Sequence, residues 1–464
     1  MHADTDPVGP PNIVLIVVDQ QRLDCLGRTS PELVSTPNID GLAAGGAWFA
    51  NAFTHIPTCC PARQSLLHGG RPESFGGLWN YDVALPVPGL SPEHPTWTAA
   101  LSGSGYDSIH LGKWHVSPTA TPGEFGYGAH IGLEDYALAR DAAGVPAAGP
   151  VGWEGGIDPA PLPFARTHWF ARQAADWIGT RPESAPWYLH LDLTEPHLPC
   201  TPVEEFAKKY RDRDTPPWPN VTDPLEGKPY IQRQQRLNWQ VQDWTWERWQ
   251  ELVRSYLAVI EQVDDAVGMI LDAVADIPNT AVVFTADHGD LTGSHGMMDK
   301  HYVMYDELVR VPLIVRWPER IRAGRIVEEL VYNLLDTVPT IYAAAGLPVP
   351  EQCVGRDLLP LLDGGTDSWR DSVVATYNGN QFGLYTQRML RTHRWKYVWN
   401  ATDVDELYDL QNDPAELHNV SGHAGNADLL GELRRSLLAT LEADGDRQVA
   451  NSWIRGQLTG GWKL

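Results

Sequence analysis

The sequence is poor in positive charge and lacks a long apolar run. Its 464 residues include 35 lysines and arginines against 59 aspartates and glutamates, which gives a formal net charge of −24. Nucleic-acid binding needs clustered basic side chains, so this composition argues against a nucleic-acid partner. The first apolar run, residues 13–18, is too short for a signal sequence or a membrane span. We therefore expect a cytoplasmic protein that has no membrane partner.

Cysteine is scarce, and the sequence has no internal repeats or low-complexity tracts. The five cysteines are odd in number and do not have the spacing of a zinc site: Cys25, Cys59, Cys60, Cys200 and Cys353. With 43% hydrophobic and 20% charged residues, the composition is that of a folded globular protein. The length suffices for one large α/β domain and a smaller one.

Apolar segments alternate with helical patterns through most of the chain. Buried strands are predicted at residues 12–18, 105–111, 187–193 and 280–286, and a helix at residues 249–275. The first strand is a continuous run rich in β-branched residues, typical of a parallel sheet covered on both faces. We expect an α/β fold with a mixed, largely parallel central sheet flanked by helices.

Other segments predict loops, caps and a domain boundary. Thr36 as cap and Pro37 at the first helical position predict the start of a short helix. Residues 116–163, rich in proline, glycine and alanine, are expected to form a long loop over the site mouth. Near residue 366 the pattern changes to short antiparallel strands and a closing helix. We divide the chain into a catalytic domain, 1–365, and a C-terminal α+β subdomain with an antiparallel sheet, 366–464.

Two features of residues 200–275 have competing interpretations. Four tryptophans in an irregular stretch either pack an extended loop, which we favour, or form an aromatic wall for a sugar or aryl substrate: Trp218, Trp239, Trp244 and Trp246. The adjacent carboxylates Asp264 and Asp265 are expected to be exposed or to cap a helix rather than to act in catalysis.

Polar side chains follow the predicted strands at the point where each strand ends. Asp19 and Gln20 follow the first strand, and Asp287 and His288 follow the strand at 280–286. Functional residues of parallel sheets gather at the carboxyl ends of the strands. These four side chains could therefore converge on one divalent cation. Oxygen ligands favour Ca²⁺ or Mg²⁺, and His288 also allows Mn²⁺.

The stretch from residue 58 to residue 72 has the features of an anion site. Pro61 favours the first turn of a helix, so Cys59 is expected just before that helix and its free N–H groups. Arg63 follows one helical turn later and brings a permanent planar cation to the same side. A cysteine, a helix N-terminus and an arginine would thus face one anion.

The pattern formed by Cys59, Pro61 and Arg63 resembles the modification motif of the type I, formylglycine-dependent sulfatases. Further segments resemble successive motifs of that family in order: residues 12–19, 36–40, 112–115, 196–197, 285–289, 300 with 305, and 310–313. Residues 391–397 and 406–410 resemble its C-terminal sheet. The resemblance covers most of the chain and implies an alkaline-phosphatase-like fold.

This resemblance implies a role for each site residue. Cys59 would be oxidised by a formylglycine-generating maturation enzyme, and the formylglycine hydrate would be both nucleophile and metal ligand. One geminal hydroxyl would attack sulfur, and the other would expel sulfate by restoring the aldehyde. The metal, usually calcium in this family, would be bound by Asp19, Gln20, Asp287 and His288. Arg63 would position the formylglycine, and Lys113 and Lys300 would bind sulfate oxygens. His115 would help to break down the sulfated hemiacetal, and His197 would protonate the leaving group.

The sequence departs from the common family pattern at two metal positions. Gln20 replaces an aspartate and His288 replaces a frequent asparagine, as in the branch that contains choline-type sulfatases and phosphonate monoester or phosphodiester hydrolases. Both changes reduce the negative charge around the metal and leave its identity open. Asn80 could be a further contact to the anion or on the metal side, as in that branch.

We expect a sulfatase that hydrolyses an alkyl, aryl or carbohydrate sulfate monoester. The first alternative is a phosphonate monoester or phosphodiester hydrolase with the same nucleophile, but Lys113 and His115 resemble the sulfatase set. The second alternative is an unmodified protein that binds a sulfo-ligand through its metal. The sequence leaves the substrate and the formation of a homo-oligomer open.

Replacing Cys59 by alanine is expected to remove nearly all turnover and to leave folding intact, because one small residue contributes little core burial. Free sulfate measures turnover, and circular dichroism measures folding. A Cys59→Ala variant that retains most of its activity would contradict the proposed nucleophile.

Overall fold

The central element of the computed structural model is an eight-stranded sheet with the order β4-β3-β5-β1-β6-β7-β2-β8. The structure describes residues 9–83, 86–149, 151–182, 184–365, 368–379 and 381–463. Neighbouring strands are parallel except that β7 runs antiparallel to β6 and β2. The strands are β1 Asn12–Asp19, β2 Ala47–Phe53, β3 Asp107–Gly112, β4 Ala129–Gly132, β5 Trp187–Pro196, β6 Thr280–Ala286, β7 Leu313–Arg316 and β8 Arg325–Tyr332. The mixed, largely parallel sheet is therefore confirmed.

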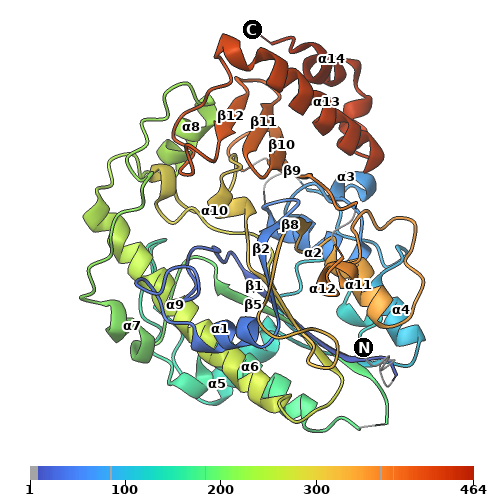
Figure 1. Cartoon of the computed structure of the whole chain (residues 1–464). Helices are drawn as coiled ribbons and strands as arrows, with labels where there is room; N and C mark the ends of the chain where they lie inside the picture. Colours follow the sequence, from blue (N-terminus) through green and yellow to red (C-terminus); the bar gives the residue numbers. More distant parts are fainter. Residues whose placement is uncertain are drawn as a thin grey trace.

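Helices cover both faces of this sheet (Figure 1). Even-numbered residues of β1, from 14 to 18, pack with one helical layer, and odd-numbered residues, from 13 to 17, pack with the other. The first layer comprises α1 Pro37–Ala44, α5 Leu133–Ala142, α6 Arg166–Ile178, α7 Glu204–Tyr210 and α9 Trp246–Ala273. The second comprises α2 Cys59–His68, α4 Trp97–Gly103, α11 Thr337–Ala344 and α12 Leu359–Leu362. Burial on both faces explains the continuous apolar run of β1.

A second, antiparallel sheet with the order β12-β11-β10-β9 lies beside the central sheet. Its strands are β9 Ser372–Gly379, β10 Tyr385–Thr392, β11 Trp395–Asn400 and β12 Glu406–Asp409. One face packs against α13 Ala427–Ala443 and α14 Ser452–Gly460, and the other against the segment around α10 Asp306–Val309. The expected domain boundary at 366 falls on residues 366 and 367, which lie outside the described residues. The division at that point therefore stays a prediction.

Residues 116–163 do not form the long loop that we expected. They include β4, which pairs with β3, and α5. The pattern of α5 was weak because this helix buries little more than Tyr136 and Arg140, too few residues for a clear apolar stripe. Residues 200–246 also contain two helices, α7 and α8 Tyr230–Asn238.

The tryptophans after residue 200 mostly pack, as we favoured. Trp218 is buried and donates its indole N–H to the carbonyl of Thr292 at 2.8 Å. Trp244 and Trp246 pack against the core. Trp239 also borders the core, and its ring meets the exposed Trp153 edge to face at 5.1 Å. Of the four tryptophans, Trp239 is thus the one that contacts a largely exposed aromatic ring, that of Trp153.

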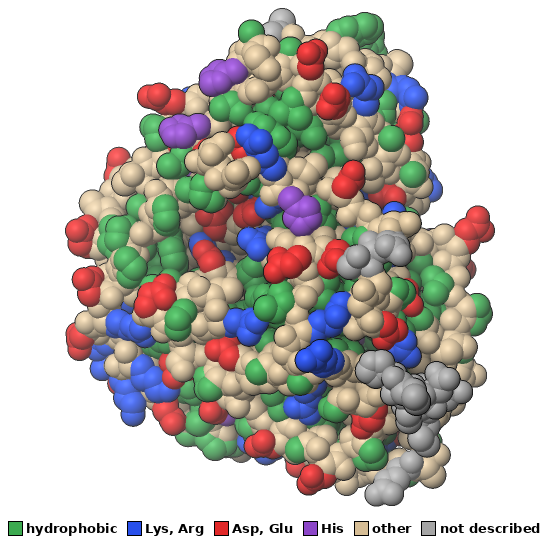
Figure 2. Space-filling view, in the orientation of Figure 1, with side chains coloured by type: hydrophobic (Ala, Val, Ile, Leu, Met, Phe, Trp, Pro, Cys, Tyr) green, Lys and Arg blue, Asp and Glu red, His purple; other side chains and the backbone are tan. Residues whose placement is uncertain are grey.

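The surface drawn in Figure 2 agrees with the acidic composition. Basic and acidic side chains are interspersed over most of this face. On this face the mixture forms no continuous basic footprint of the kind that nucleic-acid binding requires. Among the described helices, none is long and apolar enough to cross a bilayer.

The first turn of α1 is capped by a carboxylate from α9. Asp264 accepts hydrogen bonds from the backbone N–H groups of Ile39, at 2.8 Å, and Asn38, at 3.2 Å. Thr36 precedes the helix as expected, but its hydroxyl instead accepts from Gly27 N and contacts Asp40. The capping interpretation of Asp264 is thus confirmed, and the same contact joins two helices of one layer.

Asp264→Ala should lower the free energy of unfolding by about 1–3 kcal/mol, because it leaves buried backbone donors without an acceptor. Urea unfolding measures the loss. Asp265→Ala is the matched control, since the neighbouring side chain is 54% exposed and, among the described residues, pairs with His168, a contact worth at most about 1 kcal/mol. Equal losses in the two variants would contradict the capping role.

Candidate active site

The candidate nucleophile lies in the first turn of α2. Thr58 is the extended residue before the helix, and Cys59 is the first helical residue rather than the residue preceding it. The Cys59 side chain is buried. The next backbone N–H, of Cys60, donates to Asn80 Oδ1 at 3.0 Å. Asn80 therefore caps α2, and it uses one of the free N–H groups that we expected to face an anion.

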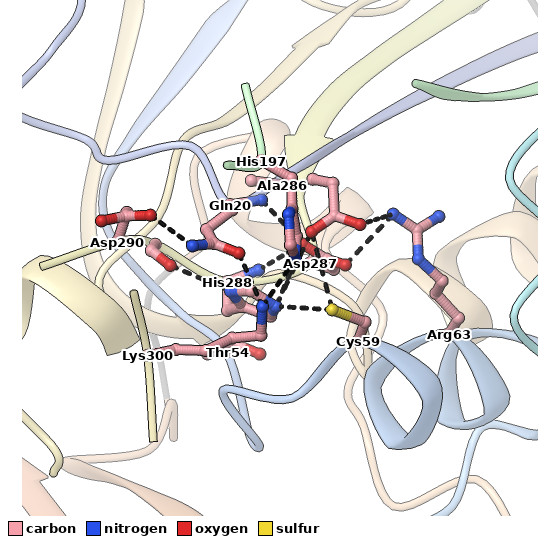
Figure 3. A network of polar contacts seen from close by, with 12 residues as sticks. Gln20, Thr54, Cys59, Arg63, His197, Ala286, Asp287, His288, Asp290 and Lys300 are labelled. Carbon is pink, nitrogen blue, oxygen red and sulfur yellow. Dashed lines mark hydrogen bonds and ion pairs between the residues drawn. The ribbon is translucent and has the colours of Figure 1, made fainter. Parts of the chain in front are cut away.

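Four potential ligands meet in front of this helix: Asp19, Cys59, Asp287 and His288. Their donor atoms all lie within 4.8 Å of one another. Cys59 Sγ contacts His288 Nε2 (Figure 3), at 3.2 Å, and lies 3.6 Å from Asp19 Oδ1. Since β1 and β6 are adjacent and parallel, with Val18 opposite Ala286, the residues that follow them reach the same sheet edge.

This donor set fits a divalent cation. Two carboxylates lie side by side in a buried place, and burial together with the charge of Asp19 raises the pKa of Asp287. Asp287 Oδ2 is 3.1 Å from Arg63 Nη2, yet this buried oxygen has no hydrogen-bond partner among the described residues. A buried anionic oxygen without a hydrogen bond is costly. A cation between these ligands would compensate it.

Arg63 lies on the same side of α2 as Cys59, as the spacing predicted, and connects three carboxylates. Its Nη2 is 3.3 Å from Asp19 Oδ2 and 3.1 Å from Asp287 Oδ2. Its Nη1 forms a short ion pair with Asp192. The guanidinium is almost completely buried. Arg63 is therefore the counter-ion of the candidate metal ligands.

The two predicted lysines belong to the same network: Lys113 directly follows β3, and Lys300 lies in the irregular segment between β6 and α10. Lys113 Nζ is 2.5 Å from Asp19 Oδ2, and Lys300 Nζ is 2.9 Å from His197 Nε2. Burial would raise the pKa of Cys59, but Lys113, Lys300 and His288 together hold it well below its ordinary value. The site is thus strongly favourable to an anion at position 59.

His115 lies at the edge of the same site, after β3. Its Nε2 is 3.1 Å from Asp82 Oδ2. The donor atoms of His115, Asp82 and Cys60 lie within 4.8 Å of one another. His115 has φ +44°, a backbone conformation that is sparsely populated for a non-glycine residue and often marks functional sites.

Gln20 contributes its backbone to the ligand cluster and turns its side chain elsewhere. Its N–H donates to Asp287 Oδ1 at 3.1 Å. The side-chain amide nitrogen contacts Asp290 and donates to Asp299 at 2.8 Å, and the amide oxygen accepts from Lys300 at 2.6 Å (Figure 3). Metal binding by the Gln20 side chain stays a prediction.

All of the predicted site residues therefore lie in one connected network. Four further carboxylates that were not predicted as site residues contact them: Asp82, Asp192, Asp290 and Asp299. Asp192 follows His190 by two residues, so both point to one face of β5. That spacing was a signal that could have been read. The carboxylates of Asp82 and Asp299 lie in segments without periodicity, and their partners become evident only in the folded chain.

The mixed sheet, with a helix N-terminus and acidic and imidazole groups at its carboxyl edge, places the chain in the alkaline-phosphatase-like class of hydrolases together with its structural neighbours. A family model described as Sulfatase matches residues 11–347. Another, described as N-sulphoglucosamine sulphohydrolase, C-terminal, matches residues 293–443. The chain belongs to the sulfatase family and is a sulfuric ester hydrolase.

Individual relatives are similar over nearly the whole chain. An arylsulfatase of Clostridium perfringens (strain 13 / Type A) is 27% identical over 482 residues, which cover 93% of this chain and 94% of that protein. The crystal structure of the phosphonate monoester hydrolase of Agrobacterium radiobacter has a TM-score of 0.80 at 25% identity, over 95% of this chain and 97% of that one. A protein solved in complex with its substrate D-glucosamine-2-N,6-O-disulfate has the same fold, with a TM-score of 0.79 at 22% identity over 94% and 99% of the two chains.

Calcium is expected to raise the unfolding temperature of protein first treated with EDTA, because a ligand at about 100 times its Kd stabilises by about 2.7 kcal/mol. Asp287→Asn should weaken this binding about tenfold or more, as measured by calorimetry with Ca²⁺, Mg²⁺ and Mn²⁺ in parallel. Asp265→Asn on α9 is the control. If Asp287→Asn binds the cations as tightly as the control does, the assigned ligand set is wrong.

Proposed function

We propose that the protein hydrolyses an organic sulfate monoester to an alcohol and inorganic sulfate. The observation that carries this proposal is the place of Cys59, in the first turn of α2, in contact with His288 and within the field of Lys113 and Lys300. A nucleophile, cationic groups and a candidate metal cluster meet there. Membership of the sulfatase family supports the same reaction.

The modified residue 59, formed by a formylglycine-generating maturation enzyme, would supply the attacking hydroxyl. A divalent cation would be held by residue 59 with Asp19, Gln20, Asp287 and His288, with Ca²⁺ as first choice and Mg²⁺ or Mn²⁺ as alternatives. When bound, it would lower the pKa of a hydroxyl ligand and neutralise charge on a sulfate oxygen. Arg63 is paired with two of these carboxylates and would fix the positions of residue 59 and the ligand side chains relative to one another.

The remaining cationic and imidazole groups would act on the sulfate and the leaving group. Lys113 and Lys300 would neutralise sulfate oxygens as charge develops in the transition state, and Asn80 would add a contact on the same side. His115 would take the proton that is released when residue 59 returns to the aldehyde. His197 Nδ1 contacts the carbonyl of Leu198, so its Nε2 faces Lys300. The proton needed by the leaving oxygen would come through this Lys300–His197 pair.

Aryl and carbohydrate sulfates are the first substrates to test. The relatives include an arylsulfatase and a fold neighbour that binds a sulfated glucosamine. The exposed Trp153, which meets Trp239 edge to face, offers a flat ring of the kind that stacks against a sugar or an aryl group.

A phosphonate monoester or phosphodiester hydrolase is the second candidate. The fold neighbour from Agrobacterium radiobacter has that activity in its name, and Gln20, His288 and Asn80 resemble that branch. Lys113 and His115 favour sulfate instead, because this pair resembles the sulfatase set. An unmodified protein that only binds a sulfo-ligand is the alternative from another class.

The ratio of rates on 4-nitrophenyl sulfate and a phenyl phosphonate ester should decide between the two hydrolases. We expect kcat/KM to be about tenfold or more higher for the sulfate. Such a ratio corresponds to about 1.4 kcal/mol or more of additional transition-state stabilisation. Mass spectrometry of the peptide that spans Cys59 checks the modification in protein matured in its own host. Cys60→Ala is the matched control for Cys59→Ala and should keep most activity.

A phosphonate preference of several decades would overturn the choice of substrate. An unmodified thiol at Cys59 in protein from its own host, together with no turnover, would support the binding protein instead.

A further inference from the structure

A row of histidines crosses the sheet behind Arg63 from an exposed residue on the edge strand, His130, to the buried His110 and His190. His130 on β4, His110 on β3 and His190 on β5 stand opposite one another in register. His110 Nδ1 is 3.0 Å from His130 Nδ1, and His110 Nε2 is 2.8 Å from Asp192 Oδ2. His190 Nε2 is 3.3 Å from the same oxygen. The row therefore ends at Asp192.

Asp192 is connected to both sides of the candidate site. Its carboxylate forms the short ion pair with Arg63 Nη1, and its carbonyl accepts the backbone N–H of Lys113 at 2.9 Å. Gly112, which faces Asp192 across β3 and β5, has φ +94°, and a Cβ there would lie 2.1 Å from the Asp192 carbonyl oxygen. This close approach requires glycine. Asp192 thus touches the residues that bear two of the site's cations.

The carboxylate is ionised in this setting. Burial would raise the pKa of Asp192, but His190, Arg63 and His110 outweigh it and keep the pKa well below its ordinary value. A buried carboxylate needs such partners, and a buried guanidinium needs them equally. Among the described contacts, Arg63 Nη1 has Asp192 as its carboxylate partner, while Nη2 lies against Asp19 and Asp287.

The geometry points to Asp192 as a positioning residue for the sulfatase reaction, an inference that rests on the proposed function. Asp192 holds Arg63 Nη1, so Nη2 stays between Asp19 and Asp287. Without Asp192, the guanidinium would move closer to these two carboxylates. His110 holds Asp192 in turn through its hydrogen bond, and His190 lies beside the same carboxylate oxygen. Arg63 thus pairs both with Asp192 and with the candidate metal ligands, and the ligands keep oxygen lone pairs for a cation.

Direct cation binding by His110, His190 and Asp192 is the competing interpretation, since their donor atoms lie within 4.8 Å of one another. Two observations disfavour it. The contact of 2.8 Å between His110 and Asp192 is a hydrogen bond, and the charge of Asp192 is already balanced by Arg63. A cation there would have to displace both partners.

Asp192→Asn tests the inference, and Asp264→Asn is the matched control. Both original carboxylates are 2% exposed, and both changes remove one charge from a buried carboxylate that accepts several hydrogen bonds. We expect both variants to lose stability. Only Asp192→Asn should lose kcat, by about 10- to 100-fold, because a charge-assisted hydrogen bond to Arg63 is lost, with KM nearly unchanged. Rates are expressed per chain that carries the modification at residue 59.

A double variant tests whether Asp192 acts through Arg63. Residues that act as a unit are not additive, so Asp192→Asn should cost little further activity in an Arg63→Lys background. Equal loss of kcat in both backgrounds, or an Asp192→Asn enzyme as active as Asp264→Asn, would overturn the inference.

A crystal structure of Asp192→Asn gives a readout that does not depend on turnover. The Arg63 guanidinium should move toward Asp19 and Asp287, and an unmoved guanidinium would overturn the inference whatever the rates are. If the modified wild-type protein releases no sulfate from any ester, the proposed function fails. The position of Arg63 in the variant still decides the role of Asp192 in that case. Metal analysis of the wild-type protein and of Asp192→Asn by mass spectrometry detects a cation bound by His110, His190 and Asp192. Finding such a cation would also overturn the inference.

Discussion

The pairing of Arg63 with carboxylates from three neighbouring strands is the interaction on which the site depends. Buried charges are tolerated only when each has a partner, and this guanidinium faces Asp19, Asp192 and Asp287. The strands β5, β1 and β6 are adjacent in the sheet, so Asp192 within β5, Asp19 at the end of β1 and Asp287 directly after β6 come to one place. A shift of register by one residue would turn these side chains to the opposite face. The sheet therefore fixes the charge geometry, and α2 supplies the cation.

The fold was predictable where burial leaves a simple pattern. The strand expected at 280–286 coincides with β6, because a strand covered on both faces appears in the sequence as one apolar run. The long helix α9 was visible from its periodicity. β4 and α5 were not, since an edge strand with exposed residues and a helix with few buried residues give no strong period in a stretch rich in proline and glycine. Tertiary contacts hold these two elements in place.

The site was predictable to the extent that its residues directly follow apolar runs. Asp19 and Asp287 stand after two such strands, and the spacing of Cys59 to Arg63 placed both on one side of α2. The partners of these residues were harder to infer. Asp192 lies inside an alternating strand, where an acid suggests a face toward water, and its ion pair with Arg63 joins residues 129 positions apart. Such pairing depends on sheet order, which local sequence does not encode.

The order of the strands in the sheet also determines when each strand can pair during synthesis. β1 is hydrogen-bonded between β5 and β6, so it can pair on both edges only after these two later strands have been synthesised. Cys59 and His288 touch in the folded chain although 229 residues separate them. Through most of synthesis the segment around Cys59 therefore lacks the neighbours that bury it. The maturation enzyme proposed for this cysteine would have access to it during that interval, before the completed fold buries it.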